Sequence, residues 1–254
     1  MLKVRNILFF FILMYLAGGI YLYIFQRDFI YFIQTEIKHD ALVQNIKINN
    51  ENIKIIVINP NKNKAILYLP GRSETVSNRI DAFKNNFPEH TVYLVNYRGY
   101  GGSSGSPSEK NLFNDAKFIY KKIQKEHKNI ILIGRSLGTG IAAYLGEKFS
   151  FSKIILVTPY DSIMGMAKDK YPFYPISFIL KDHYNSLKRV KNIRSKTLVL
   201  LASKDETIEA KYSNNLIKAF NPKILTVKTI KDSGHNSIIK KEDYFKEMRL
   251  FLAQ

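Results

Sequence analysis

Runs of apolar, mostly β-branched residues alternate with stretches of helical periodicity along most of the chain. Runs that are apolar at every position, rather than at every second one, are typical of parallel strands covered on both faces. Their alternation with helices predicts an α/β domain built on a mostly parallel sheet with helices on both faces. Eight strands are expected, at about residues 46–48, 54–58, 65–69, 91–95, 130–133, 153–158, 197–202 and 224–230.

The first two strands are expected to pair antiparallel, because residues 49–52, Asn-Asn-Glu-Asn, are typical of a turn. Helices are expected between the later strands. The clearest one covers 109–127, where apolar residues such as Leu112 and Ile119 recur at helical spacing opposite a face of lysines. Further helical stretches lie at about 76–87, 137–149, 208–220 and 236–252.

Residues 159–196 interrupt this rhythm, since they separate two strands without a simple helical period. The aromatic and proline-rich sequence Tyr-Pro-Phe-Tyr-Pro lies inside them, at 171–175. Insertions above the carboxyl edge of an open α/β sheet are where substrate pockets form. We therefore expect a short lid here, and the alternative is a packed crossover that makes no substrate contact.

The N-terminal segment is apolar enough for a membrane. Residues 7–25 carry no charge, and a helix of about 20 apolar residues crosses a bilayer core. A cleavable signal peptide is the rival interpretation, but the apolar run continues well past the small residues at 17–19. We expect an uncleaved transmembrane anchor over residues 1–26, a linker over 27–45 and one domain over 46–254.

The basic residues at the ends of this segment predict its orientation. Lys3 and Arg5 precede the apolar run, whereas Arg27 follows it next to Asp28. Basic residues favour the cytoplasmic side of a membrane. We expect a single-pass protein with a cytoplasmic N-terminus and a body on the opposite, periplasmic or extracytoplasmic, side.

Composition narrows the chemistry. The 254 residues include no cysteine, which excludes disulfides, zinc–cysteine sites and iron–sulfur clusters. The formal net charge of +18 is compatible with nucleic acid, with an anionic membrane surface, or with lysines that only coat solvated helix faces. The lysines of the 109–127 helix support the last interpretation, and no nucleic-acid-binding motif is present. We expect no nucleic-acid partner.

Residues 130–140 contain the most informative motif. A strand run ends in Gly134-Arg135-Ser136-Leu137-Gly138, and a helical stretch follows at once. This is G-x-S-x-G at a strand-to-helix turn, the nucleophile elbow. The turn strains the backbone of the serine, and the residues two before and two after it must carry almost no side chain. Ser136 is the candidate nucleophile, and a plain turn is the alternative for these five residues alone.

A serine hydroxyl needs a neighbouring base, and histidine is the usual one because its pKa lies near neutral pH. The chain has five histidines. His235 follows the last strand, in a loop at the carboxyl edge of the sheet, where Ser136 is also expected. The other four lie in the linker, at the amino edge, at the end of a helix and in the lid: His39, His90, His127 and His183. We take His235 as the base.

The base needs an acceptor that orients it. Asp205 follows the buried strand at 197–202 and lies between Ser136 and His235 in the chain. Glu206 is its nearest competitor and Asp182 a more distant one. A role in a turn or helix cap is the structural alternative, because aspartate is a common turn former. We take Asp205 as the acid.

The order Ser136, Asp205, His235, together with the elbow and the strand rhythm, resembles the α/β-hydrolase superfamily over residues 45–254. Residues 97–103, Tyr-Arg-Gly-Tyr-Gly-Gly-Ser, are similar to a loop of the small single-span serine hydrolases of bacteria, yeast and animals. Residues 162–163 and 167–172 also resemble their short lid. The resemblance implies an eight-stranded α/β-hydrolase fold preceded by one transmembrane helix.

The resemblance also implies an oxyanion hole made of two backbone amides. One is the N–H of Leu137, and the other comes from the loop after the 65–69 strand. Relatives carry a His-Gly-Asn or similar tripeptide there, whereas this chain has Pro70-Gly71-Arg72, so Arg72 supplies the expected amide. The usual histidine is missing.

These residues together suggest a serine hydrolase that acts on an acyl ester or thioester. No cofactor or metal is expected, and the substrate is a small molecule, a lipid or an acylated protein. A peptidase or amidase of the same fold and a catalytically idle membrane-tethered binding module are the alternatives. The side chains of Arg72 and Arg135 either approach the pocket mouth, where they favour an anionic group, or point to solvent or pair with acids.

Overall fold

The computed structural model describes residues 2–254, with side chains from Val4 onward. Its strands are β1 Leu42–Ile48, β2 Glu51–Ile58, β3 Lys64–Leu69, β4 His90–Val95, β5 Asn129–Arg135, β6 Lys153–Val157, β7 Thr197–Ala202 and β8 Leu225–Ile230. They form one sheet in the order β1-β2-β4-β3-β5-β6-β7-β8. The pairs β1–β2 and β2–β4 are antiparallel, and all other pairs are parallel. The prediction of an eight-stranded, mostly parallel sheet is confirmed.

The opening hairpin is longer than predicted and its turn is shorter. β1 begins at Leu42 and β2 at Glu51, so the turn consists of Asn49 and Asn50 alone. Both asparagines adopt left-handed backbone conformations, with φ of 48° and 67°. Asparagine tolerates this region, and such a two-residue turn matches the twist of the paired strands. The expected four-residue turn is therefore wrong.

The helices of the body are α2 Ile80–Asn86, α3 Glu109–Ile123, α4 Leu137–Lys148, α8 Ala210–Ala219 and α9 Glu242–Ala253. The helix expected over 109–127 ends four residues early. The helix expected over 236–252 is also interrupted, because a 3₁₀ turn, Ile238–Lys240, separates α9 from the loop that carries His235.

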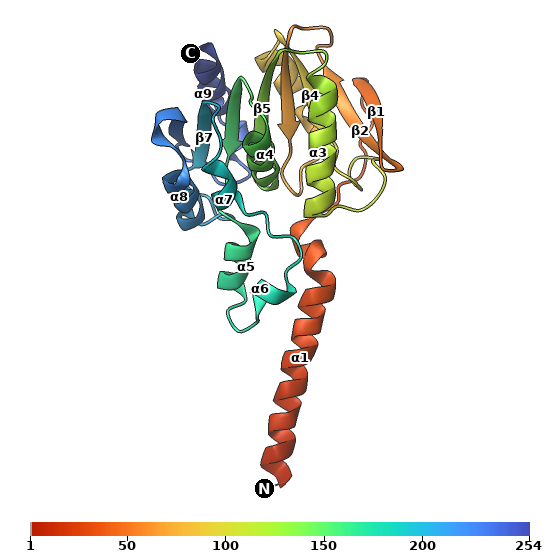
Figure 1. Ribbon diagram of the computed structural model, residues 1–254, viewed down its shortest axis with the longest axis vertical. Helices are drawn as coiled ribbons and strands as arrows, with labels where there is room; N and C mark the ends of the chain where they lie inside the picture. The colour runs from red at the N-terminus through yellow and green to blue at the C-terminus, as the bar shows by residue number, and fades with distance from the viewer. Residues whose placement is uncertain (1) are drawn as a thin grey trace.

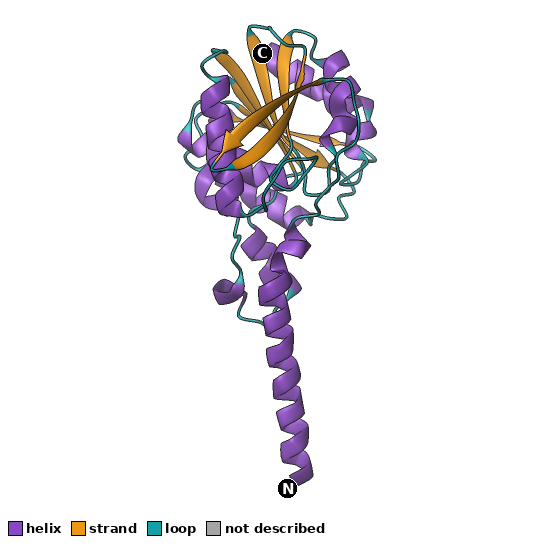
Figure 2. Cartoon of the chain, turned by 90° about the vertical axis from the view of Figure 1, so that its right-hand side faces the viewer, coloured by secondary structure: helices purple, strands orange, loops and turns teal. Residues whose placement is uncertain are grey.

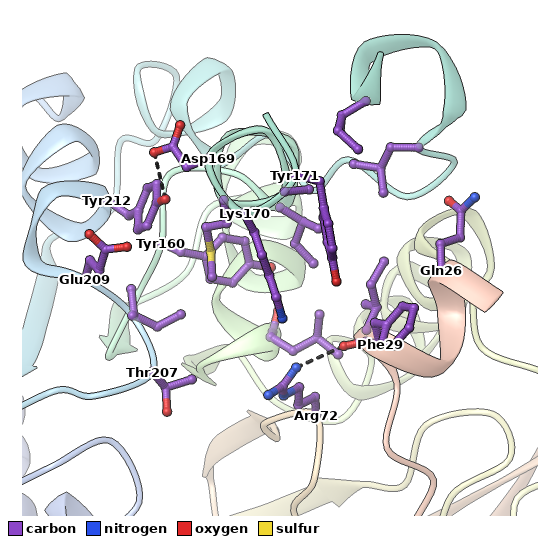
Figure 3. A pocket seen from close by; sticks show the side chains of 18 of the residues that line it. Gln26, Phe29, Arg72, Tyr160, Asp169, Lys170, Tyr171, Thr207, Glu209 and Tyr212 are labelled. Carbon is purple, nitrogen blue, oxygen red and sulfur yellow. Dashed lines mark hydrogen bonds between the residues drawn. The ribbon is translucent and has the colours of Figure 1, made fainter. Parts of the chain in front are cut away.

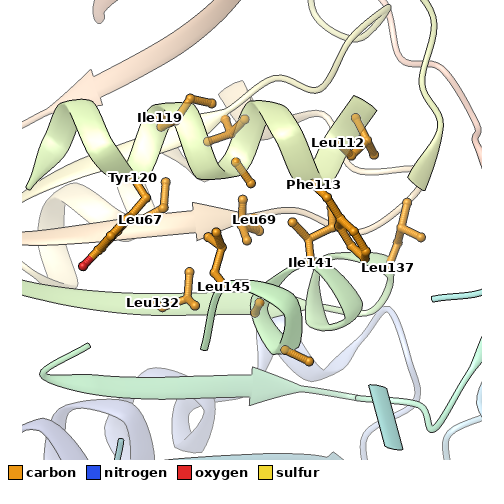
Figure 4. Packing of buried hydrophobic residues seen from close by; sticks show 14 of the residues in the cluster. Leu67, Leu69, Leu112, Phe113, Ile119, Tyr120, Leu132, Leu137, Ile141 and Leu145 are labelled. Atoms are coloured by element: carbon orange, nitrogen blue, oxygen red, sulfur yellow. The ribbon is translucent and has the colours of Figure 1, made fainter. Parts of the chain in front are cut away.

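Helices cover both faces of the sheet and create two hydrophobic cores (Figure 2). Successive residues of a strand point to opposite faces. In β3, Leu67 and Leu69 belong to one core, whereas Ile66 and Tyr68 belong to the other. The first core packs α3 and α4 against the sheet (Figure 4), and the second packs α2 and α9. This two-sided burial explains the uninterrupted apolar runs of the central strands.

A long helix, α1 Leu2–Ile30, projects from the body (Figure 1). It is long and apolar enough to cross a membrane, as judged by length and composition. The helix continues past the expected boundary at residue 26, and only residues 31–41 connect it to β1. This connection is fixed to the body, where the Gly101 amide donates to the Gln34 carbonyl at 2.8 Å. Lys3, used to predict the orientation, lies outside the described side chains.

The segment expected to be a lid folds into three short helices, α5 Ile163–Lys170, α6 Ile176–Ile179 and α7 Ser186–Val190. α7 rejoins the body, and its Val190 is part of the first core. α5 and α6 lie outside the sheet and beside the upper part of α1 (Figure 1). The segment therefore connects the body with the projecting helix.

Candidate active site

The parallel strands bring the predicted residues to one edge of the sheet. Ser136 directly follows β5, Asp205 follows β7, and His235 follows β8. The carboxyl ends of β5 to β8 all lie at this edge because these strands are parallel. Such an edge is where sites form in open α/β sheets. Three loops far apart in the chain thus meet above the sheet.

Ser136 stands on a strained turn, as the motif predicts. Its φ of 48° and ψ of −118° are unusual for a residue with a side chain, and such conformations cost on the order of 1–3 kcal/mol. The surrounding structure holds it there: the Ser136 amide donates to the Val157 carbonyl at 2.9 Å, and the Thr139 hydroxyl donates to the Ser136 carbonyl at 2.6 Å. The strained residue is therefore tied to both β6 and α4.

The two flanking glycines leave room for close backbone contact. A Cβ atom on Gly134 would lie 2.6 Å from the carbonyl oxygen of Gly138, and one on Gly138 would collide with the carbonyl of Leu69. Real Cβ atoms do not approach so closely. Any larger residue at either position must push the elbow away from β3 or from the start of α4. This is the steric reason for the G-x-S-x-G pattern.

The three predicted side chains form a continuous hydrogen-bonded chain. His235 Nε2 lies 2.9 Å from Ser136 Oγ, and His235 Nδ1 lies 2.9 Å and 3.0 Å from the two carboxylate oxygens of Asp205. An ionised carboxylate only accepts hydrogen bonds, so Nδ1 carries the proton and Nε2 of the neutral ring faces the serine hydroxyl as an acceptor. Ser136 and His235 are both buried, with 7% and 4% of their surfaces exposed.

Asp205 is held as a carboxylate by its surroundings. Burial raises its pKa, but hydrogen bonds from His235 and from the amides of Ile208 and Thr207 lower it more. The net result is a pKa below the ordinary value. The amide bonds measure 2.8 Å and 2.9 Å. Asp205 is therefore charged at neutral pH and orients the imidazole ring.

The two acids considered as alternatives to Asp205 make other hydrogen bonds. The Glu206 carboxylate accepts the backbone amide of His235 at 3.0 Å, so it fixes the histidine loop and not the ring. Asp182 is buried away from Ser136, and it accepts from Arg27 at 3.0 Å and from the Tyr31 hydroxyl at 3.1 Å. It ties the end of α1 to the body. Neither side chain bonds to the His235 ring.

The other histidines lie outside this arrangement. The ring of His127 pairs with the Tyr93 hydroxyl at 2.9 Å, and that of His183 contacts the Leu180 carbonyl at 2.8 Å. His90 begins β4 at the amino edge of the sheet. His39 lies in the connection before β1. Of the five histidines, all of them among the described residues, only His235 hydrogen-bonds to Ser136.

The loop after β3 contacts the nucleophile. A Cβ atom on Gly71 would lie only 3.4 Å from that of Ser136. The Gly71 amide is not available to an oxyanion, since it donates to the Glu74 carboxylate at 3.0 Å. Among the described residues, the amides of Arg72 and Leu137 donate to no acceptor. These are the two amides expected to form the oxyanion hole.

Two tyrosines that were not singled out in the sequence hold this loop in place. The Tyr97 hydroxyl donates to the Pro70 carbonyl and the Tyr100 hydroxyl donates to the Arg72 carbonyl, each at 2.8 Å. The carbonyls of Pro70 and Arg72, which flank the Gly71–Arg72 peptide and its amide, are thus anchored. Both tyrosines belong to residues 97–103, the loop that resembles other hydrolases. Their position in that loop was the feature of the sequence that could have identified them.

A buried ion pair supports the same region. Pairing of Arg135 with an acid was one of the alternatives drawn from the sequence, but the partner was not identified there. Arg135 donates from Nη1 to Glu74 at 3.1 Å and from Nη2 to the His235 carbonyl at 3.1 Å. Glu74 also accepts from Arg79 at 2.7 Å. Burial raises the pKa of Glu74, but Arg135 and Arg79 outweigh that effect and hold it below the ordinary value. Arg135 therefore does not approach the pocket mouth; it links the loop after β3 to the histidine loop.

A cavity of about 460 Å³ opens beside Ser136 (Figure 3). This volume falls within the usual range for small-molecule sites. Its walls come from the body, from α5 and α6, and from the end of α1. The apolar lining residues include Leu22 and Phe29 of α1, Met166 of α5, and Ile176 and Ile179 of α6. The segment over 159–196 thus contributes directly to the pocket.

Arg72 lies in this cavity and is held by α1. Its guanidinium donates to the Phe29 carbonyl at 2.9 Å (Figure 3). The same group lies 4.5 Å from the centre of the Phe32 ring. Burial lowers its pKa from the ordinary value, yet the group stays cationic at neutral pH. Arg72 is therefore the arginine that faces the pocket.

Comparison with known proteins identifies the fold. A sequence model of the family described as alpha/beta hydrolase fold matches residues 64–183. The esterase Pf2001 of Pyrococcus furiosus superposes with a TM-score of 0.66 at 14% identity, over 87% of this chain and 98% of the esterase. The chain has the α/β-hydrolase fold.

Curated relatives match part of this chain. An uncharacterized protein of Mycobacterium tuberculosis is 31% identical over 151 residues, which is 58% of this chain and 53% of that protein. The human alpha/beta hydrolase domain-containing protein 17C is 26% identical over 166 residues, 64% of this chain and 49% of that protein. The chain thus spans about half the length of the curated relatives it matches.

Proposed function

We propose that this α/β hydrolase is a membrane-anchored serine hydrolase that cleaves an acyl ester or thioester. The observation that carries the proposal is the 2.9 Å contact between Ser136 Oγ and His235 Nε2, with Asp205 on the other side of the ring. A serine next to a base that is oriented by a carboxylate is the arrangement that activates a hydroxyl for nucleophilic attack.

In the first half of the reaction, Ser136 Oγ attacks the acyl carbonyl carbon while His235 takes the hydroxyl proton. Asp205 stabilises the resulting imidazolium. The oxyanion accepts hydrogen bonds from the amides of Leu137 and Arg72, and the N-terminus of α4 adds a favourable dipole at Leu137. The tetrahedral intermediate collapses, and His235 returns its proton to the departing alcohol or thiol.

In the second half, water attacks the acyl-enzyme on Ser136. His235 takes a proton from this water, and the same amides stabilise the second oxyanion. Collapse releases the carboxylic acid and restores the serine hydroxyl. The chemistry needs no group beyond the side chains and amides described, so no cofactor or metal enters the proposed cycle.

The proposed anchor is α1, with its N-terminus in the cytoplasm and the body on the extracytoplasmic side. The contacts of α1 with the body support its retention in the mature protein. Arg27 pairs with the buried Asp182, and Phe29 accepts a hydrogen bond from Arg72 in the pocket. Removal of the helix would leave both partners without these contacts and open the pocket wall.

The apolar pocket supports an acyl substrate. Ester, thioester and amide hydrolysis share this machinery, so an amide substrate is the alternative outcome. Assays should compare p-nitrophenyl esters, acyl thioesters and acyl anilides of increasing chain length. We expect ester and thioester turnover to exceed that of the matched anilide.

The test of the nucleophile is labelling of the purified full chain with a fluorophosphonate, wild type against Ser136→Ala. We expect covalent labelling and ester turnover in the wild type and neither in the variant, with a loss of about 10⁴-fold or more in kcat. Wild-type turnover in Ser136→Ala would disprove the assignment. A folded wild type that neither labels nor turns over any acyl substrate would instead support a tethered binding module.

A further inference from the structure

The segment that runs from the end of α5 through α6 lies at the end of the molecule where α1 projects (Figure 1). It exposes large apolar side chains. Phe173 is 84% exposed and Phe178 is 89% exposed. Residues 171–179, Tyr-Pro-Phe-Tyr-Pro-Ile-Ser-Phe-Ile, contain no charged side chain. An exposed apolar surface of this kind marks a contact with a partner or a membrane. We name residues 171–179 the aromatic loop.

The aromatic loop packs directly on the apolar helix. The rings of Tyr174 and Tyr15 stack with their centres 4.9 Å apart and their planes 4° from parallel. Gly18 lies beneath Tyr174, and a Cβ atom at this position would collide with the Tyr174 hydroxyl. Small residues allow such close packing against helices in membranes. The loop and α1 therefore form one unit on the membrane side of the body.

Polar groups of α1 pair with the backbone of the aromatic loop. The Tyr15 hydroxyl donates to the Phe173 carbonyl at 2.8 Å. Gln26 donates to the Ile179 carbonyl at 2.9 Å and accepts the Lys181 amide at 2.6 Å. Irregular backbone is tolerated inside a bilayer only where its polar groups are paired within the protein. The loop thus pairs these backbone groups internally while it turns two phenylalanines outward.

The position of the aromatic loop along α1 indicates how deeply the loop would lie in a membrane. The ammonium of Lys181 lies 3.9 Å from the centre of the Tyr23 ring. Lysine and tyrosine together are typical of the headgroup level of a membrane. Tyr15, which contacts Phe173 and Tyr174, lies eight residues earlier on the helix, or about 12 Å deeper at 1.5 Å per residue. The tip of the loop therefore lies at the level of the acyl chains.

The cavity beside Ser136 is bounded by these two elements. Leu22 of α1 and Ile176 and Ile179 of the aromatic loop line it. We propose that the aromatic loop inserts into the outer leaflet together with α1, and that the acyl chain of a membrane-resident substrate enters the cavity between them directly from the bilayer. The entry route rests on the proposed hydrolase function, whereas the insertion is independent of it.

Insertion can be measured with a single fluorophore, because the chain contains no native cysteine. Phe178→Cys labelled with an NBD dye is compared with Leu250→Cys, a 52% exposed apolar position on α9. The full chain is reconstituted in phosphatidylcholine and phosphatidylglycerol vesicles that contain 5-doxyl lipid. We expect a blue-shifted label at 178 that the doxyl lipid quenches, and a label at 250 that only aqueous iodide quenches.

Equal quenching of both labels by iodide, with Ser136 still labelled by a fluorophosphonate, would overturn insertion and leave the hydrolase proposal standing. A quenched label at 178 with no labelling of Ser136 would do the reverse: insertion would stand, and the entry route would fall with the hydrolase proposal.

Entry from the leaflet is tested by kinetics. In a Phe173→Ser/Phe178→Ser variant, we expect hydrolysis of a long-chain ester embedded in vesicles to fall about tenfold, because two exposed phenylalanines that contact the membrane are lost. Hydrolysis of a soluble butyrate ester should stay within about twofold of the wild type. Leu250→Ser is the control. An equal decrease for both substrates would overturn the entry route.

Discussion

The two ends of the pocket are built in different ways. At the sheet end, Ser136, His235 and Asp205 follow parallel strands, and each is held by hydrogen bonds within the body. At the other end, α1 and the aromatic loop hold each other through stacking and a few hydrogen bonds, and they present Phe173 and Phe178 outward. The proposed chemistry lies on the rigid part, and the proposed substrate contact lies on the part outside the sheet.

This difference explains how one fold can accommodate many substrates. Sites on strands and strand ends keep catalytic geometry within narrow limits, whereas connecting segments vary without disturbing it. Changes at the sheet end should therefore affect every substrate equally. Changes at the α1 end should affect substrates according to their chain length. The following experiments test this contrast, beginning with the largest expected effect.

Replacement of His235 by alanine should abolish the activity at the sheet end. We expect kcat to fall by about 10⁴-fold or more for short and long esters alike, because the serine loses its base. Steady-state kinetics on the detergent-solubilised full chain would measure this. His90→Ala, at the opposite edge of the sheet, is the matched control and should keep its activity. Loss for long esters alone would contradict the division between the two ends.

Replacement of Glu74 by glutamine should destabilise the sheet end. Arg135 and Arg79 would lose their carboxylate in a buried site, and breaking a buried pair typically costs about 3 kcal/mol. Urea unfolding followed by circular dichroism in detergent would measure the loss. Glu247→Gln is the control, since its partner Lys228 is 51% exposed and surface pairs contribute at most about 1 kcal/mol. Equal losses in both variants would show that the buried pair is not a support.

The effect of Glu74→Gln on the free energy of unfolding should depend on pH. The pKa of Glu74 is lower in the folded protein than its ordinary value, so the folded state binds this proton more weakly than the unfolded chain does. Its stabilising contribution is present above the ordinary carboxyl pKa of about 4.3 and is lost as pH falls through the lower folded value. We expect the difference in unfolding free energy between wild type and Glu74→Gln to shrink from pH 7 to pH 3.5. A constant difference would contradict this.

A smaller effect is expected from Tyr97→Phe. The Pro70 carbonyl would lose the hydroxyl that anchors it, and the Arg72 amide would be less firmly held. Loss of an oxyanion donor itself costs 10²- to 10³-fold, so loss of its support should lower kcat by about tenfold with little change in KM. Tyr93→Phe is the control, because its hydroxyl bonds to His127 instead. A change in KM alone would place Tyr97 in substrate binding.

Local patterns were sufficient to predict most of the sheet end. Uninterrupted apolar strands indicate a sheet covered on both faces. The close backbone contacts of the elbow require glycine at positions 134 and 138, so the motif is visible in the sequence. Ser136, Asp205 and His235 each follow a strand, and parallel topology then brings them to one edge. The structure places all three in contact, as their order in the chain suggested.

The hydrogen-bonded supports of the site and the α1 end of the pocket could not be predicted in the same way. Glu74 and Arg135 are 61 residues apart, and neither lies in a motif that indicates its partner. In the sequence, Gly18 was only one of the small residues that could indicate a signal-peptide cleavage site. Its contact with Tyr174 could not be predicted, because this contact depends on the three-dimensional path of a segment without periodicity. The short turn at Asn49 and Asn50 was missed because β2 begins in polar sequence, at Glu51 and Asn52.

The central claim is that Ser136 carries the acyl group during turnover. The most direct measurement is to mix the full chain with a p-nitrophenyl ester, quench within milliseconds and map the acylated peptide by mass spectrometry. We expect a burst of nitrophenol together with an acyl group on Ser136, and no such adduct in His235→Ala. Turnover at the wild-type rate with no adduct, or with an adduct at another residue, would contradict the claim.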